Sequence, residues 1–114
     1  MEVNPRELII YETEQGEAPF SEWLDSLRDR LARARIKKRL DRVELGNLGD
    51  YKAVGEGVYE LRIDYGPGYR IYYGNVDLTI ILLLCGGDKD TQERDISLAQ
   101  QFWNDFKQRE DANE

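Results

Sequence analysis

The stretch ELRIDYGPGYRIYY, residues 60–73, decides the fold of this chain. Apolar and polar residues alternate on both sides of Gly66-Pro67-Gly68, which predicts two antiparallel strands joined by a tight turn. Pairing about Gly66 places Arg62 opposite Arg70 across the two strands. Like charges that face each other across strands are unfavourable by up to ~1 kcal/mol. The hairpin therefore needs something that offsets this repulsion.

Two interpretations of the facing arginines are open. The same pairing sets Glu60 opposite Tyr72, on the face away from the apolar residues of the hairpin. In the first interpretation this is a solvated sheet face, and Glu60 or Asp64 neutralises each arginine. In the second, the two guanidinium groups form a clamp for a phosphate, whose charge removes the repulsion. A shift of one residue in the pairing would separate the arginines.

The remaining sequence predicts an α+β domain of order β-α-α-β-β-β-α. The expected elements are a strand over 7–12, a helix from Pro19, a second helix ended by Gly46 and Gly49, hairpin strands over 58–64 and 69–73, a buried strand over 78–84 stopped by Gly86-Gly87, and a last helix. We expect a small, mostly antiparallel sheet with a helical hairpin and a C-terminal helix, the helices lying on one side. Ser26 and Asp29 indicate a cap between the first two helices. A single domain over 1–110 and a polar tail over 111–114 complete the prediction.

The composition of the chain limits the kinds of functional site that it can form. The chain has 114 residues, 40% of them hydrophobic and 34% charged, which is typical of one globular domain. It has one cysteine and no histidine, so a disulfide framework, a structural zinc site and a Ser-His-Asp mechanism are not expected. We expect no metal and no cofactor. No secretory signal or membrane-spanning run is visible, so a cytoplasmic location is expected.

The charge is unevenly distributed. The net charge is −7, yet residues 28–42 hold eight basic and two acidic residues, a local charge of +6 that leaves −13 for the rest. Helical spacing puts four of these cations in a stripe: Arg35, Lys38, Arg39 and Arg42. The stripe is either a solvated helix face, a docking surface for polyphosphate, or a contact for an acidic protein.

A second charged segment is CGGDKDTQERD, residues 85–95, which follows the buried strand and opens the last helix. Lys89 and Arg94 can join a charged cleft at the end of that strand. In the plainer interpretation, the glycines end the strand and acidic residues begin the helix. The helix dipole stabilises acidic residues at that position. The segment lacks the spacing of a phosphate-binding P-loop.

Three motifs together resemble a known family. They are Y-E-L-R over 59–62, G-Y-R-I-Y-Y over 68–73 and G-G-D-K over 86–89. At these spacings the sequence resembles the RelE/ParE toxin superfamily, and more narrowly its HigB-like branch of phage-derived addiction module killer proteins. The resemblance covers roughly residues 5 to 108, and the order of elements agrees with that family.

The resemblance implies the toxin of a type II toxin–antitoxin pair, with a cognate antitoxin of helix-turn-helix type. RelE-like members cut mRNA in the ribosomal A site without metal, by attack of a 2′-hydroxyl on the adjacent phosphate. By resemblance, Arg70 contacts the scissile phosphate, Arg62 is a second cation, and Lys89 stabilises charge or the leaving group. Lys52 is a further candidate. The residues that would contact the ribosome or mRNA are Arg35, Lys38, Arg39, Arg42, Lys52 and Arg94.

Two positions differ from RelE, and other functions stay open. Glu60 replaces a lysine and is either a general base or a partner for Arg62. The C-terminal tyrosine of RelE has no match, so Tyr72 or Tyr73 would substitute; Asp95 stands near its place. The alternatives are a ParE-like inhibitor of gyrase without catalysis, and an inactive relative that only binds antitoxin. We predict that the two hairpin arginines and Lys89 converge on one concave face, with no carboxylate binding all three.

Overall fold

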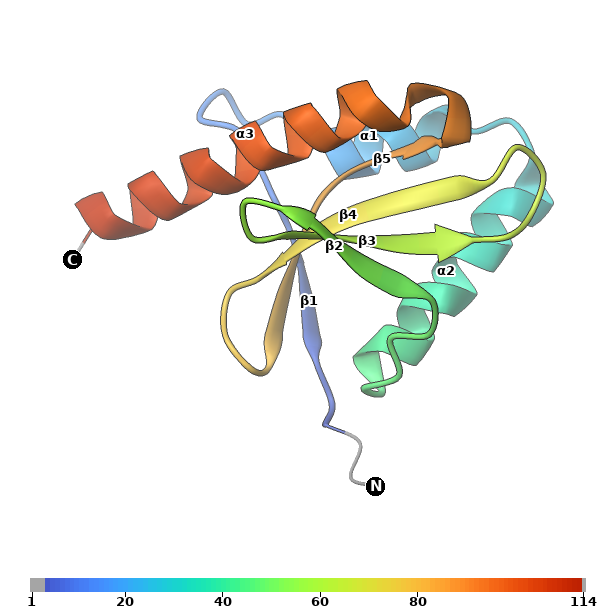
Figure 1. The fold of residues 1–114 in the computed structure, drawn as a ribbon, viewed down its shortest axis with the longest axis horizontal. Coiled ribbons are helices and arrows are strands. Elements are labelled where there is room, and N and C mark those ends of the chain that lie inside the picture. Colours follow the sequence, from blue (N-terminus) through green and yellow to red (C-terminus); the bar gives the residue numbers. More distant parts are fainter. Residues whose placement is uncertain (1–3, 114) are drawn as a thin grey trace.

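A computed structural model of the chain describes residues 4–113 and confirms the α+β class (Figure 1). The elements follow in the order β1 (Glu7–Ile10), α1 (Pro19–Ser26), α2 (Arg30–Glu44), β2 (Tyr51–Gly55), β3 (Val58–Ile63), β4 (Tyr69–Asn75), β5 (Ile80–Asp88), the 3₁₀ turn η1 (Lys89–Thr91) and α3 (Gln92–Ala112). The strands form one sheet in the order β1-β5-β4-β3-β2. β1 runs parallel to β5, and all other neighbours are antiparallel.

The sheet has one strand more than the sequence predicted. β2 pairs with β3 at the edge of the sheet, and four of its five residues are exposed. Such a strand buries no alternating apolar face, so the period-two pattern that marks a half-buried strand is missing. The prediction of β5 as a central, buried strand is confirmed.

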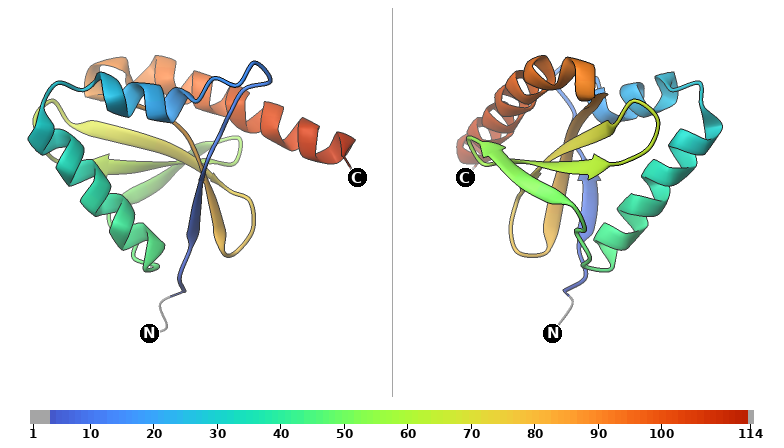
Figure 2. Two further views of the ribbon diagram at one scale, coloured as in Figure 1. Left: turned by 180° about the vertical axis from the view of Figure 1, so that it is seen from behind. Right: turned by 45° about the vertical axis from the view of Figure 1, so that its right-hand side comes forward.

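Helices cover both faces of the sheet, which corrects the prediction of helices on one side. α1 and α2 lie on one face and α3 on the other (Figure 2). The first core contains Phe20, Ile36, Leu40, Val43, Leu61 and Ile71. The second contains Tyr11, Val58, Tyr72, Leu82, Leu84, Ala99 and Trp103. The prediction failed because the second face of the hairpin carries charged and phenolic groups, and these groups are usually solvated.

α1 and α2 meet at residues 27–29 and diverge from there as a V (Figure 2). Asp29 is the N-cap of α2, and its Oδ1 accepts hydrogen bonds from the amides of Leu31 and Ala32 at 3.0 and 3.2 Å. Ser26 is not part of this cap, because its hydroxyl donates to the carbonyl of Trp23 within α1. α2 buries one apolar face, formed by Ala32, Ile36, Leu40 and Val43.

Gly86 and Gly87 do not stop β5, because the strand continues through both to Asp88. Their role is close packing. A Cβ on Gly86 would lie 2.2 Å from the ring of Trp23, and a Cβ on Gly87 would lie 1.8 Å from Oδ2 of Asp95. Only glycine lets α1 and α3 approach the strand this closely.

α3 extends to Ala112 and therefore includes the first two residues of the expected tail. Glu114 lies outside the described residues. Among residues 4–113, none of the helices combines the length and the apolar character that a membrane crossing requires.

Candidate anion-binding site

The hairpin pairs in the register that the sequence predicted. Arg62 lies opposite Arg70, and Glu60 lies opposite Tyr72. The turn depends on glycine, since Gly66 and Gly68 have φ angles of 57° and 84°. The two arginines therefore share the face of the sheet that α3 covers.

Glu60 is the partner that offsets the repulsion. The residue is fully buried, and its Oε1 lies 3.1 Å from Nε of Arg62 and 3.7 Å from Nε of Arg70. Its Oε2 accepts a hydrogen bond of 2.9 Å from Nε2 of Gln92. Both ion pairs use the inner nitrogen of the guanidinium. Within residues 4–113, the terminal Nη atoms of these two arginines donate no hydrogen bond, which leaves them free for an anion.

Glu60 is suited to hold the arginines rather than to act as a base. Burial alone would raise the pKa of its carboxyl, but hydrogen bonds from Gln92 and Arg62 and the charge of Arg70 outweigh burial and hold that pKa below its ordinary value. The carboxylate is thus ionised at neutral pH and closed off from solvent. Between the two roles predicted for Glu60, this environment favours the partner for arginine.

The two tyrosines proposed as substitutes are also buried. Tyr72 is 0% exposed, and burial together with the charge of Glu60 raises the pKa of its phenol. Its hydroxyl lies near Glu60 but makes no hydrogen bond of standard geometry among the described residues. Tyr73 belongs to the core under α1 and α2, on the opposite face. Neither phenol is exposed to a substrate.

Arg62, Arg70 and Lys89 line one open cavity of about 290 Å³, which we call the arginine cavity. Gly68 lies between two of them, since a Cβ at this position would be 3.6 Å from Nη1 of Arg70 and 3.7 Å from Cβ of Lys89. The predicted convergence of the three cations is confirmed by this geometry.

Two carboxylates, Asp50 and Asp64, complete the wall of the arginine cavity. In the described part of the chain, no ion pair joins either aspartate to a cation of the cavity. Glu60 pairs with the two arginines and not with Lys89, so no carboxylate binds all three cations. Asp64 directly follows β3 and was expected from the sequence as a possible partner of an arginine, but Glu60 is the partner of both. Asp50 precedes β2, which gave no strand signal.

The turn that carries Lys89 is held by its neighbours. The side chain of Asp88 accepts hydrogen bonds from the amides of Asp90 and Thr91 at 2.9 and 3.3 Å. The Thr91 hydroxyl in turn donates to Asp95, which is 4% exposed. Asp95, near the place of the RelE tyrosine by resemblance, therefore supports this turn.

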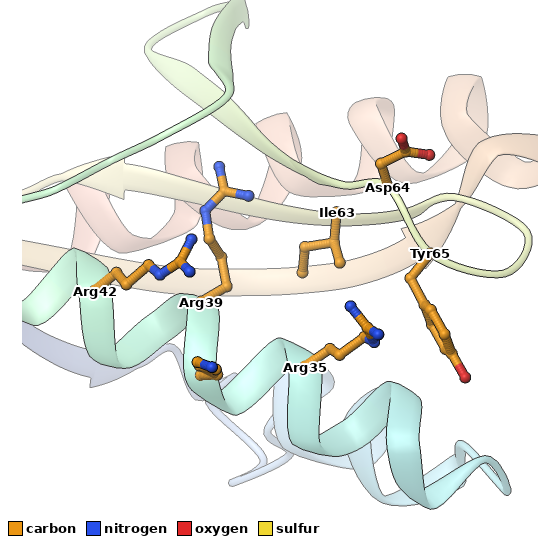
Figure 3. A pocket seen from close by; sticks show the side chains of 7 residues that line it. Arg35, Arg39, Arg42, Ile63, Asp64 and Tyr65 are labelled. Carbon is orange, nitrogen blue, oxygen red and sulfur yellow. The ribbon is translucent and has the colours of Figure 1, made fainter.

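The basic stripe of α2 lines a second cavity, about 220 Å³, which we call the helix cavity (Figure 3). Its lining comprises Arg35, Lys38, Arg39, Arg42, Ile63, Asp64 and Tyr65. Arg39 differs from the other cations, because its guanidinium donates to the carbonyls of Arg62, Leu48 and Asp50 at 2.6, 2.8 and 2.7 Å. Burial lowers the pKa of Arg39. Arg39 thus joins α2 to the sheet and is not a free cation.

Lys52 and Arg94 lie outside the arginine cavity. Lys52 is exposed in β2 and sits opposite Glu60 in the strand register. Arg94 lies on α3 with a side chain that is 71% exposed, 3.5 Å from Asp95. Arg94 and Lys89 nevertheless line a separate open cavity of about 460 Å³, as the sequence predicted for the segment that follows β5.

Cys85 belongs to the core beneath α3, and burial raises the pKa of its thiol to about 12. Across residues 4–113, no group of three or more histidine, cysteine, aspartate or glutamate residues is arranged to hold a metal ion.

Comparison with known proteins identifies the family of the chain. No family model matches the chain. An uncharacterized protein of Haemophilus influenzae is 48% identical over 81 residues, a region that covers 71% of this chain and 82% of the Haemophilus protein. At that identity and coverage, the chain belongs to the same family as this Haemophilus influenzae protein.

Proposed function

We propose that this chain is the toxin of a type II toxin–antitoxin pair and a ribosome-dependent endoribonuclease that cleaves mRNA without metal. The observation that carries the proposal is the arginine cavity: Arg62, Arg70 and Lys89 converge there, and Glu60 fixes the arginines through Nε. The resemblance of the Y-E-L-R, G-Y-R-I-Y-Y and G-G-D-K motifs to RelE-like toxins supports the same function.

The proposed reaction is an attack of the RNA 2′-oxygen on the adjacent phosphorus. A bond forms between the 2′-oxygen and phosphorus, and the bond from phosphorus to the 5′-oxygen breaks. The products are a 2′,3′-cyclic phosphate and a 5′-hydroxyl. Negative charge accumulates on the phosphoryl oxygens in the transition state, and fixed cations stabilise that state more than the substrate.

The proton transfers are assigned to exposed groups of the cavity. Asp50 and Asp64 are the carboxylates of its wall that can accept the proton of the 2′-hydroxyl, since Glu60 is fully buried. Lys89 is exposed and can donate a proton to the departing 5′-oxygen. The arginines stay charged and bind the phosphoryl oxygens.

The test is expression of the chain from an inducible promoter in cells without an antitoxin. Wild type should arrest growth, and transcripts should acquire new 5′-hydroxyl ends within coding regions. Arg70→Ala should reduce cleavage by at least ~100-fold, the usual effect of removing one transition-state donor. Lys107→Ala, which removes an exposed cation of α3 that does not line the cavity, serves as the control. Normal growth and intact transcripts with wild type would refute the proposal.

The same experiment separates the other candidates. The net charge of −7 and Glu60, which is buried against both arginines, favour an inactive relative that binds antitoxin. That function predicts normal growth with antitoxin binding retained. A gyrase inhibitor predicts a DNA-damage response with intact mRNA.

A further inference from the structure

The helix cavity contains free cations. Arg35, Lys38 and Arg42 are exposed, and in the part of the chain that the structure describes their side chains form no ion pair or hydrogen bond. Asp64 is the one carboxylate in the lining. The free charge of the cavity therefore favours an anion.

Arg35 is held in position, unlike a cation on an ordinary solvated helix face. Its guanidinium carbon lies 4.6 Å from the centre of the Tyr65 ring, and the two side chains face each other in Figure 3. The Tyr65 hydroxyl donates to Oδ2 of Asp29 at 3.2 Å. Oδ1 of Asp29 caps α2. One aspartate thus fixes both the start of the helix and the ring beneath the guanidinium.

The two cavities adjoin. Ile63 and Asp64 line both of them. Arg39, in the helix cavity, donates to the carbonyls of Arg62 and Asp50, two residues of the arginine cavity. The end of β3 therefore separates the helix cavity from the arginine cavity. The phosphates of a single extended nucleic-acid strand can reach both cavities.

We propose that the helix cavity is a second phosphate subsite for the RNA strand whose scissile phosphate lies in the arginine cavity. This inference rests on the proposed function, because it takes its ligand, single-stranded RNA, from it. Arg35, Lys38 and Arg42 bind a phosphate away from the cleavage point, while Arg39 keeps the two cavities in register.

The experiment measures binding of single-stranded RNA carrying 2′-O-methyl groups, which cannot be cleaved, as a dinucleotide and as a longer oligonucleotide. The double variant Arg35→Gln with Lys38→Gln should bind the longer RNA about tenfold more weakly. The slope of log affinity against log salt concentration should fall by about one. Its affinity for the dinucleotide should not change. Arg30→Gln with Lys37→Gln is the matched control, since both side chains are exposed on α2 outside the two cavities.

Equal losses in the two double variants would overturn the inference, because they would indicate a general effect of helix charge. A loss that extends to the dinucleotide, or no loss with the longer RNA, would also overturn it. Tyr65→Leu keeps every charge but removes the ring under Arg35. It should therefore lower the affinity for the longer RNA and leave the affinity for the dinucleotide unchanged. Thermal unfolding of each variant confirms that it is folded.

This binding assay is independent of cleavage. If wild type shows the expected dependence on RNA length but cuts no transcript in cells, the nuclease proposal fails and the second subsite stands. If wild type cuts transcripts and the Arg35/Lys38 variant binds RNA normally, the nuclease proposal stands and the second subsite fails. Binding of a structured ribosomal RNA in place of the single strand counts against the subsite.

Discussion

At the scale of single residues, Glu60 determines what the two facing arginines can do. Its fully buried carboxylate contacts Nε of both arginines through Oε1. Its other oxygen, Oε2, accepts a hydrogen bond from Gln92. The sequence allowed the register of Arg62 and Arg70 to be predicted, because the alternation is symmetric about the turn. It did not reveal that Glu60 is buried, because burial depends on α3 covering that face, and Gln92 gave no signal of its own.

The hydrogen bond from Gln92 should be visible in the pH dependence of stability. The pKa of Glu60 lies below its ordinary value in the folded protein, so its contribution is present above the unfolded pKa, about 4.3, and is lost as the pH falls through the folded pKa. Gln92→Met removes one hydrogen bond that lowers this pKa. The loss of stability on acidification should therefore be smaller than in wild type and should end at a higher pH, as measured by urea unfolding.

Gln100→Met is the control for this measurement. Gln100 also lies on α3 and donates one hydrogen bond, 3.0 Å long, to the carbonyl of Val54. Since no titrating group accepts this bond, the variant should lose the same stability at every pH. Parallel pH profiles for the two variants would contradict the role assigned to Gln92.

At the scale of elements, strand segments without a periodic apolar pattern were the hardest to predict. β2 was missed because it buries no apolar stripe, and the extension of β5 was missed because Gly86 and Gly87 usually end a strand. The three helices and the hairpin were predicted, since each buries a periodic apolar face. The cap of α2 could be placed near residue 28, but only the structure distinguishes Asp29 from Ser26.

The two residues at this joint should differ in their effect on stability. Asp29→Ala removes the N-cap of α2 and the partner of Tyr65, and should lower the free energy of unfolding by about 1–2 kcal/mol. Ser26→Ala removes only a bond within α1 on an exposed side chain, and should change it by less than about 0.5 kcal/mol. Urea unfolding measures both, and equal losses would argue against Asp29 as the cap.

At the scale of the whole molecule, buried phenols stabilise the packing of α3 and α2 against the sheet. Tyr11 is 2% exposed and donates to Oδ2 of Asp105 on α3 at 2.6 Å. Burial and this carboxylate raise the pKa of Tyr11 to about 12. Burial also raises the pKa of Tyr72 and Tyr73 on the two faces of the sheet. Each phenol must therefore stay protonated in the folded state.

Alkaline pH should consequently unfold the protein. A phenol with a raised folded pKa contributes stability that is complete below the unfolded pKa, about 10, and declines as the pH rises above it. Tyr11→Phe cannot ionise, so its stability should fall less steeply above about pH 10. Urea unfolding across this range measures the slopes, and an unchanged slope in Tyr11→Phe would contradict the assignment.

The parallel pairing of β1 with β5 has a consequence for folding during synthesis. β1 is the first strand of the chain and β5 the last, and β5 lies between β1 and β4. During synthesis, β1 therefore cannot pair within the sheet until β5 has left the ribosome. Pairings between segments so distant in sequence form late in folding. Lys89 follows directly on β5, so the third cation of the arginine cavity arrives at the same moment. A nascent chain thus has no complete cavity before residue 89 has left the ribosome.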